Sequence, residues 1–192
     1  MTGNYADGRR AGWVRALTGV VLGVGALLQA GVASAGPLVR TGAFKEATSS
    51  QVRAMLARDN GTVHGTIVSY RGSVARVTVV VPQPEFPFPK FEIHHVDNPT
   101  LDFRAGTTVK FTFIDRVMGF SHSFQITRKA PPFPMFPKIR PVLAGTELSP
   151  PPGDGKSVYA DFTWRPAAGH YYYLCAIPGH AHMGMFGAII VK

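Results

Sequence analysis

The sequence predicts an all-β protein, a β-sandwich of short strands with one short helix near its start. Glycine (21) and proline (16) are frequent among the 192 residues, which favours many turns. After residue 61, short stretches rich in β-branched and aromatic residues alternate with these turns. Hydrophobic residues make up 45% of the chain, which is enough to fill the core of one domain.

Residues 1–35 are predicted to be a signal peptide. Three arginines precede an apolar, glycine-rich stretch over residues 16–30, and residues 33–35 read Ala-Ser-Ala, a small-residue cleavage site. The apolar run is interrupted and shorter than the roughly 20 apolar residues that a spanning helix needs. We therefore expect export to the periplasm, followed by cleavage, and a single domain over residues 36–192.

Residues 44–61 are predicted to form a helical extension at the start of this domain. Val52, Met55 and Leu56 have the spacing of one face of a helix, and the serine pair at 49–50 can cap its start. The pattern predicts a helix of about three turns, whose apolar face covers part of the β-structure.

The predicted strands begin after this helix and continue to the end of the chain. Residues 107–114 show the clearest pattern, because Val109, Phe111 and Phe113 alternate with other residues as on a half-buried strand. Residues 71–73 (Arg-Gly-Ser) indicate the turn of a hairpin between two consecutive strands. The predicted strands are 62–70, 74–81, 91–96, 101–103, 107–114, 122–127, 157–164, 170–174 and 186–191.

One loop near the end of the chain carries the residues of a metal site. Cys175, His180 and Met185 follow each other at five-residue intervals, and Cys175 is the single cysteine of the chain. In an oxidising compartment a lone cysteine has no partner within the chain, so a ligand role is favoured. Thiolate and thioether select copper, and two His and one Cys with a weak axial Met form a blue-copper site. A second histidine must therefore come from elsewhere.

Histidines upstream of the cysteine are the candidates for this missing ligand. His122 is preferred, because it begins a predicted strand directly after a turn and could face a loop at the same end of a sandwich. Spacing alone leaves the others open. The full set of candidates is His64, His94, His95, His122 and His170.

At this point the sequence resembles the cupredoxins, the blue copper proteins. Residues 119–124 (Gly-Phe-Ser-His-Ser-Phe) and the ligand loop with its continuation, residues 175–187, carry the resemblance. It extends over roughly residues 44–192 and includes residues 98–101 (Asn-Pro-Thr-Leu) and 161–164 (Asp-Phe-Thr-Trp). The ligand loop is longer than in many cupredoxins, which makes the match specific.

The resemblance implies a Greek-key sandwich that binds one type 1 copper ion, cycling between Cu(I) and Cu(II). His122, Cys175 and His180 would be the equatorial ligands and Met185 the axial ligand. An apolar shell is expected to give the copper a high reduction potential. The residues expected in this shell are Phe120, Phe124, Ile177, Pro178 and Phe186.

The resemblance also implies a periplasmic electron carrier that passes single electrons between respiratory redox proteins such as cytochromes c, as in iron-oxidising bacteria. His180 would be the electron port, with transient docking around it, and the protein would act as a monomer. No catalytic residue is expected, so the chain is not predicted to be an enzyme. The alternative is a periplasmic protein that binds and delivers copper.

Several positions depart from the family pattern. Many cupredoxins have Asn after the first histidine, where this chain has Ser123. An asparagine expected a few residues before that histidine is replaced in the segment Val117-Met118, so one hydrogen bond of the family's site is expected to be missing here. Met183 is a competing candidate for the axial position, and His182 is expected to be an exposed residue at the rim.

Other classes of function are poorly supported. A multicopper oxidase needs several further His-x-His pairs, and a binuclear copper site needs two cysteines. The net charge of +9 does not indicate nucleic-acid binding, because the basic residues are dispersed and not interleaved with aromatic residues.

Overall fold

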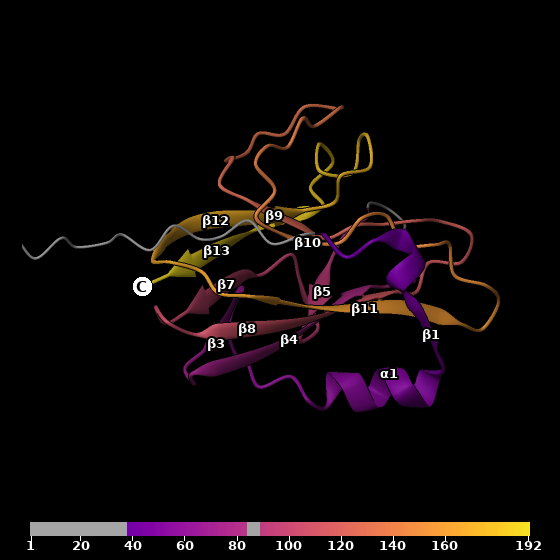
Figure 1. Cartoon of the computed structure of the whole chain (residues 1–192), viewed down its shortest axis with the longest axis horizontal. Coiled ribbons are helices and arrows are strands. Elements are labelled where there is room, and N and C mark those ends of the chain that lie inside the picture. Colours follow the sequence, from indigo (N-terminus) through magenta and orange to yellow (C-terminus); the bar gives the residue numbers. More distant parts are fainter. Residues whose placement is uncertain (1–37, 84–88) are drawn as a thin grey trace, which may run out of the picture.

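Two β-sheets pack against each other in the computed structural model, which describes residues 38–83 and 89–192 (Figure 1). The predicted signal peptide, residues 1–35, lies outside these described residues. The first sheet runs in the order β1 (Lys45–Ala47), β11 (Ser157–Trp164), β8 (Thr108–Asp115), β4 (Val74–Val81), β5 (Glu92–Ile93) and β6 (Val96–Asp97). The second runs in the order β10 (Ala144–Gly145), β9 (Gln125–Thr127), β12 (Gly169–Leu174), β13 (Phe186–Val191), β7 (Thr100–Phe103), β3 (Ile67–Tyr70) and β2 (Thr62–His64).

The predicted all-β sandwich is confirmed. Both sheets are mixed: the pairs β4–β8, β13–β7 and β3–β7 are parallel, and the other neighbours are antiparallel. Among residues 38–83 and 89–192 the helices are the single turn η1 (Thr41–Ala43) and α1 (Ser49–Leu56). None of the helices within the described ranges has the length and apolar character needed to cross a bilayer.

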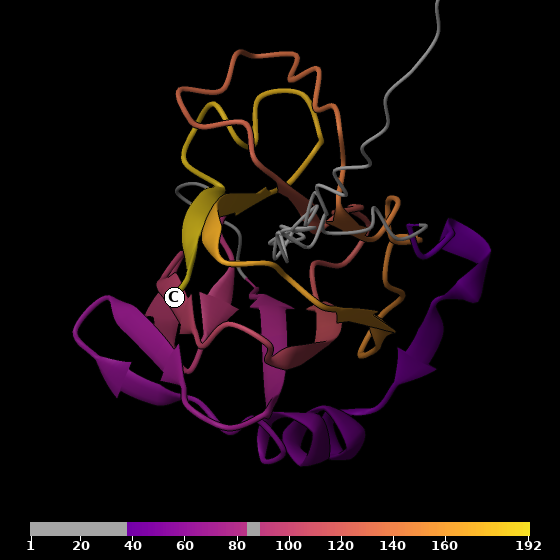
Figure 2. The same ribbon diagram turned by 60° about the vertical axis from the view of Figure 1, so that its left-hand side comes forward.

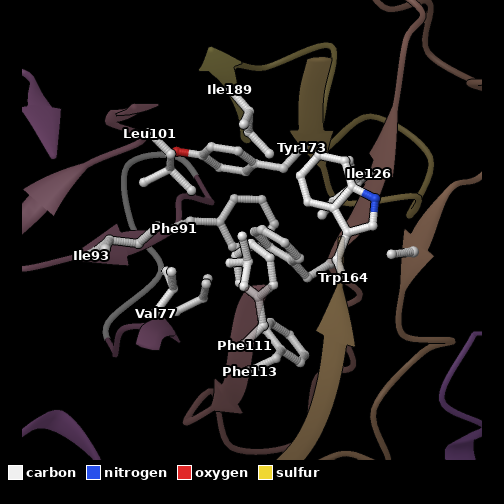
Figure 3. Packing of buried hydrophobic residues seen from close by; sticks show 14 of the residues in the cluster. Val77, Phe91, Ile93, Leu101, Phe111, Phe113, Ile126, Trp164, Tyr173 and Ile189 are labelled. Atoms are coloured by element: carbon white, nitrogen blue, oxygen red, sulfur yellow. The ribbon is translucent and has the colours of Figure 1, made fainter. Parts of the chain in front are cut away.

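The core lies between the two sheets and is largely aromatic (Figure 3). Val109, Phe111 and Phe113 all point into it and are fully buried, as the alternation of residues 107–114 predicts. Across the core, the ring centroids of Phe111 in β8 and Phe124, just before β9, lie 5.4 Å apart, and Tyr173 of β12 stacks on Phe124 at 5.0 Å. Such ring pairs add to the free energy gained by burying apolar surface, so they stabilise the packing of one sheet on the other.

The helix α1 packs on the outer face of the first sheet. Val52 is buried against Val80 of β4 and Ile114 of β8. The N-cap is Thr48, not one of the two serines, because Thr48 and Gln51 form a reciprocal capping box. The helix has 8 residues and is therefore shorter than the three turns that its sequence pattern predicts.

The hairpin predicted around residues 71–73 is wrong. The strand before it, β3, belongs to the second sheet, and the strand after it, β4, belongs to the first. Each pairs in parallel with a more distant strand, β3 with β7 and β4 with β8. A Gly-containing turn between two strands signals a change of direction, but it does not show whether the chain stays in one sheet.

Three other predicted strands are shorter or interrupted. Residues 62–70 divide at Gly65, and residues 91–96 divide at His94 and His95, all with left-handed backbones. The β5–β6 hairpin therefore turns on two histidines, with φ of 52° and 61°. The predicted strand 122–127 begins only at Gln125, so His122 lies in an irregular segment before β9.

Candidate metal centre

Two loops meet at one end of the sandwich. The loop between β9 and β10 and the loop between β12 and β13 project side by side, away from α1 (Figures 1 and 2). The backbone N–H of Gly179 in the second loop donates to the carbonyl of Met135 in the first, at 2.7 Å. The loop from Cys175 to Met185 is thus held by a hydrogen bond to the neighbouring loop as well as by hydrogen bonds within itself.

The three ligand candidates of this loop are tied together through the backbone. Cys175 N–H donates to the carbonyl of Met185 at 3.2 Å, and Met185 N–H donates to the carbonyl of His180 at 2.9 Å. Cys175 and Met185 are fully buried, whereas His180 is half-buried. The loop therefore brings sulfur donors into the interior and keeps one imidazole near the surface.

His122 reaches the same place from a distant part of the chain. Its ring is fully buried, and the ring centroids of His122 and His180 are 5.2 Å apart. Its backbone is fixed by Ser149, which donates its N–H to the His122 carbonyl at 2.7 Å. The Ser149 hydroxyl accepts from His122 N–H at 2.9 Å. The structure thus places this histidine, of all the candidates upstream of the cysteine, beside the ligand loop.

The sequence reasoning missed a buried carboxylate beside His122. Asp115, the last residue of β8, has Oδ2 at 2.9 Å from His122 Nδ1. It also accepts from the Ser149 hydroxyl at 2.6 Å and from the backbone N–H of Val117 at 3.0 Å. The feature of the sequence that could have identified Asp115 is an acidic residue at the end of an otherwise apolar strand. The Val117-Met118 segment itself supplies a backbone donor to this carboxylate and no side-chain hydrogen bond among those described.

Ser123 links the segment of His122 to the cysteine. Its hydroxyl accepts from the backbone N–H of Ala176 at 2.9 Å and lies 3.9 Å from Cys175 Sγ, to which it donates. Burial raises the pKa of Cys175 to about 11, although hydrogen bonds from the Ile177 backbone and from Ser123 lower it. The thiol of the metal-free chain therefore holds its proton at neutral pH, and metal binding must displace it.

Asn98 is a second residue that the sequence reasoning did not single out for the site. From the turn before β7, with φ of 46°, its side-chain amide donates to the carbonyl of Gly184 at 3.1 Å. Its amide oxygen accepts from the backbone N–H of Phe91 at 3.0 Å. It therefore holds the end of the ligand loop against the core.

The other histidine candidates lie elsewhere. His94 Nε2 is 2.7 Å from the buried carboxylate of Asp59, and His95 is paired with Glu92 at 3.1 Å. His64 and His170 are exposed on β2 and β12. His182 is exposed, as predicted, with Nδ1 at 3.1 Å from the Phe133 carbonyl.

Burial distinguishes the two methionines that could be axial. Met185 is 0% exposed and belongs to the same buried cluster as Cys175, whereas Met183 is 45% exposed. Met185 is therefore the better placed of the two. Phe124 is buried next to the site, but Phe120 is 62% exposed, so Phe120 does not belong to an apolar shell around the metal.

The donor set fits copper in its chemistry. Throughout residues 38–83 and 89–192, no three His, Cys, Asp or Glu side chains have the close mutual spacing of a preformed metal cluster. The fit depends instead on donor type and burial: a thiol, two imidazoles and a thioether converge, and water has little access to the sulfur atoms. Soft sulfur donors combined with imidazole are the ligands that copper prefers.

Comparison with known proteins agrees with this chemistry. Residues 97–192 match the family described as copper binding proteins, plastocyanin/azurin family. The chain is 56% identical to rusticyanin from Acidithiobacillus ferrooxidans over 151 residues, which is 79% of this chain and 97% of the relative. It is 53% identical to rusticyanin from Acidithiobacillus ferridurans over 177 residues, 90% of this chain and 94% of the relative.

Solved structures are similar to the same extent. A structure of rusticyanin from Thiobacillus ferrooxidans superimposes with a TM-score of 0.77 at 54% identity, covering 81% of this chain and all (100%) of that chain. A structure of reduced rusticyanin superimposes with a TM-score of 0.75 at 55% identity, covering 78% and 99% of the two chains.

Proposed function

Because the chain belongs to the rusticyanins, blue copper electron carriers of the cupredoxin family, we propose that His122, Cys175, His180 and Met185 bind its copper ion. The observation that supports this assignment best is the meeting of two distant segments. The ring of His122 lies 5.2 Å from that of His180, and His180 shares its loop, through backbone hydrogen bonds, with the buried Cys175 and Met185.

Bound copper would supply the one-electron change between Cu(II) and Cu(I), and the protein would hold the ligands in place during it. Three features of this chain serve that purpose. The ligand loop is closed by its own backbone hydrogen bonds, Ser123 ties it to the segment of His122, and Asn98 anchors its end. A frame of this kind allows little rearrangement of the ligands on electron transfer.

We propose that electrons enter and leave through the half-buried ring of His180. Exposed apolar side chains surround this end of the molecule: Met183 is 45% exposed, Met135 47% and Phe136 71%. A Cβ added at Gly179, next to His180, would meet the side chains of Met135 and Met183. A transient redox partner, such as a cytochrome c, would dock on this apolar surface, and the chain would act as a monomer.

We propose that the protein acts in the periplasm. The signal peptide predicted over residues 1–35 supports export to the periplasm. There the protein would carry single electrons between respiratory redox proteins, as in a chain that oxidises iron. It would transfer electrons without catalysing a reaction on a substrate of its own.

The test is to load the purified protein with copper and compare two methionine variants. We expect intense blue absorption and reversible oxidation and reduction without loss of metal, and loss of the blue colour in Cys175→Ser. Met185→Leu should change the spectrum and the reduction potential, because the variant loses its axial sulfur. Met183→Leu is the matched control and should leave both unchanged.

Two results would contradict this assignment. If Met183→Leu changed the spectrum and Met185→Leu did not, the axial ligand would be Met183. If the wild-type protein released its copper on each reduction, delivery of copper would replace electron transfer as its function.

A further inference from the structure

We infer that a recess on the outer face of the first sheet binds a phosphate group, either as free phosphate or as part of a small phosphorylated molecule. The inference does not depend on the copper ligands. The recess has a volume of about 380 Å³, which falls within the range of small-molecule sites, about 300–1,000 Å³. It lies beside the C-terminal end of α1, on the part of the molecule turned away from the ligand loop (Figure 1).

The alternation of side chains along neighbouring strands brings two cations to this recess. In β4 the exposed Arg76 precedes the buried Val77, and in β8 the exposed Lys110 precedes the buried Phe111. Arg76 and Lys110 are partners in the parallel register of β4 and β8, so they lie side by side on the outer face. Thr163 of β11 is the partner of Lys110 on its other side and adds a hydroxyl to the same row.

A third cation comes from the segment that follows α1. The backbone N–H of Arg58 donates to the carbonyl of Met55 at 3.1 Å, and both residues line the recess. Two guanidinium groups and one ammonium group therefore surround a single recess. Arginine suits a phosphate group because its planar guanidinium can donate two parallel hydrogen bonds to phosphate oxygens.

The protein balances only part of this positive charge. Asp161 is the acidic residue of the lining, which leaves the recess with a net charge of +2. The Asp161 carboxylate accepts from the hydroxyl of its cross-strand partner Thr112 at 2.6 Å. Among the residues that the structure describes, no carboxylate forms an ion pair with any of the three cationic side chains of the recess.

The pairing of like charges favours an anion in this place. Arg76 and Lys110 repel each other across the two strands, which destabilises the sheet. An anion bound by both side chains replaces this repulsion with attraction. A phosphate monoester carries a charge of about −1.5 to −2 at neutral pH, which complements the charge of the recess.

The recess is not lined by polar groups alone. Met55 of α1 and Phe162 of β11 also contribute to its wall. These side chains give the organic part of a phosphorylated molecule an apolar surface to contact. Free phosphate would use the cationic side chains only.

The experiment is a calorimetric titration of the purified protein with inorganic phosphate and, separately, with phenyl phosphate. Ionic strength is held constant, because salt screens exposed charges. We expect the wild-type protein to bind at one site. The double variant Arg76→Gln, Lys110→Gln should bind about tenfold more weakly or worse, because it loses two charge-assisted hydrogen bonds. Tighter binding of phenyl phosphate would assign the recess to a phosphorylated molecule, and equal or weaker binding to free phosphate.

A matched control makes the test specific. The double variant Arg40→Gln, Lys129→Gln removes the same two charges at exposed positions outside the recess and should bind like the wild type. Thermal unfolding gives a second readout. Compared with chloride at equal ionic strength, phosphate should raise the melting temperature of the wild type and of the control, but not that of Arg76→Gln, Lys110→Gln.

Two results would overturn the inference. In the first, neither inorganic phosphate nor phenyl phosphate binds to the wild-type protein. In the second, the control variant loses as much affinity as Arg76→Gln, Lys110→Gln, which would show that phosphate responds to the overall charge of the protein and not to this recess.

Discussion

At the scale of single residues, the site depends on a few buried polar groups whose hydrogen bonds are made within the protein. Ser123 is the clearest case, because one buried hydroxyl contacts both the Ala176 backbone and the Cys175 sulfur, at 2.9 Å and 3.9 Å. A hydroxyl of this kind cannot be removed without leaving a donor of the ligand loop without its partner.

Ser123→Ala should therefore destabilise the copper-free protein. The loss of the acceptor for the Ala176 N–H is expected to cost about 1–3 kcal/mol in the free energy of unfolding. Denaturant unfolding followed by fluorescence would measure this cost. Ser121→Ala, two residues earlier, provides the control, and an equal loss in both variants would contradict the role given to Ser123.

At the scale of elements, the helix α1 is defined by its first turn and by the face it buries. Thr48 accepts from the Gln51 N–H at 3.4 Å, and the Gln51 side chain accepts from the Thr48 N–H at 2.8 Å. Val52 then packs onto the outer face of β4 and β8. The helix covers the sheet far from the ligand loop, so its role is structural (Figure 1).

Thr48→Ala should lower the free energy of unfolding by about 1 kcal/mol, the usual cost of losing an N-cap. Ser49→Ala, at a position that the sequence pattern favours as a cap, should have a smaller effect. Thermal unfolding of the two variants shows whether Thr48 or Ser49 is the N-cap of the helix. The blue spectrum should be the same in both, because neither residue lies near the ligand loop. A larger effect of Ser49→Ala would show that the cap was assigned to the wrong residue.

At the scale of the whole molecule, a charged cluster joins three strands of the second sheet. Asp102 of β7 accepts from Arg71, which follows β3, at 2.6 Å, and pairs with Lys192, which follows β13, at 3.2 Å. Burial alone would raise the pKa of Asp102, but Arg71 and Lys192 outweigh it, so the pKa lies below its ordinary value. The cluster therefore stabilises the fold only while Asp102 is ionised.

This cluster predicts a defined dependence of stability on pH. The pKa of Asp102 is lower in the folded than in the unfolded chain, so its contribution is fully present above about pH 4, the unfolded value. As the pH falls through the folded pKa, the contribution is lost. The difference in unfolding free energy between wild type and Asp102→Asn should thus be largest at neutral pH and shrink in acid. Denaturant titrations at a series of pH values measure it, with the exposed Asp154→Asn as control, and a difference that grew in acid would contradict the sign.

Much of the site could be predicted because its chemistry lies in a short stretch of chain. Cys175, His180 and Met185 are close in the sequence, so their donor types and spacing indicate copper before any fold is known. Long alternating strands such as β8 and β11 were also predicted within one or two residues. In both cases the signal is local, so a window of sequence contains all of it.

The parts that were missed depend on contacts between distant residues. Asp115 and Ser149 are far apart in the chain, yet both contact the backbone or ring of His122. The turn at residues 71–73 looks like a hairpin turn, although its two strands belong to different sheets. Neither fact is visible in a short window, because neither depends on local preferences.

By itself, the sequence determined the all-β class, the copper-type donor set and the family to which the chain belongs. The tertiary structure alone decided which strands pair and which carboxylate contacts the histidine that the family resemblance had already pointed to, His122. The physical reason is that donor chemistry and strand alternation are properties of neighbouring residues. Pairing and burial instead depend on how two sheets pack, which brings residues from distant parts of the chain into one low-dielectric interior.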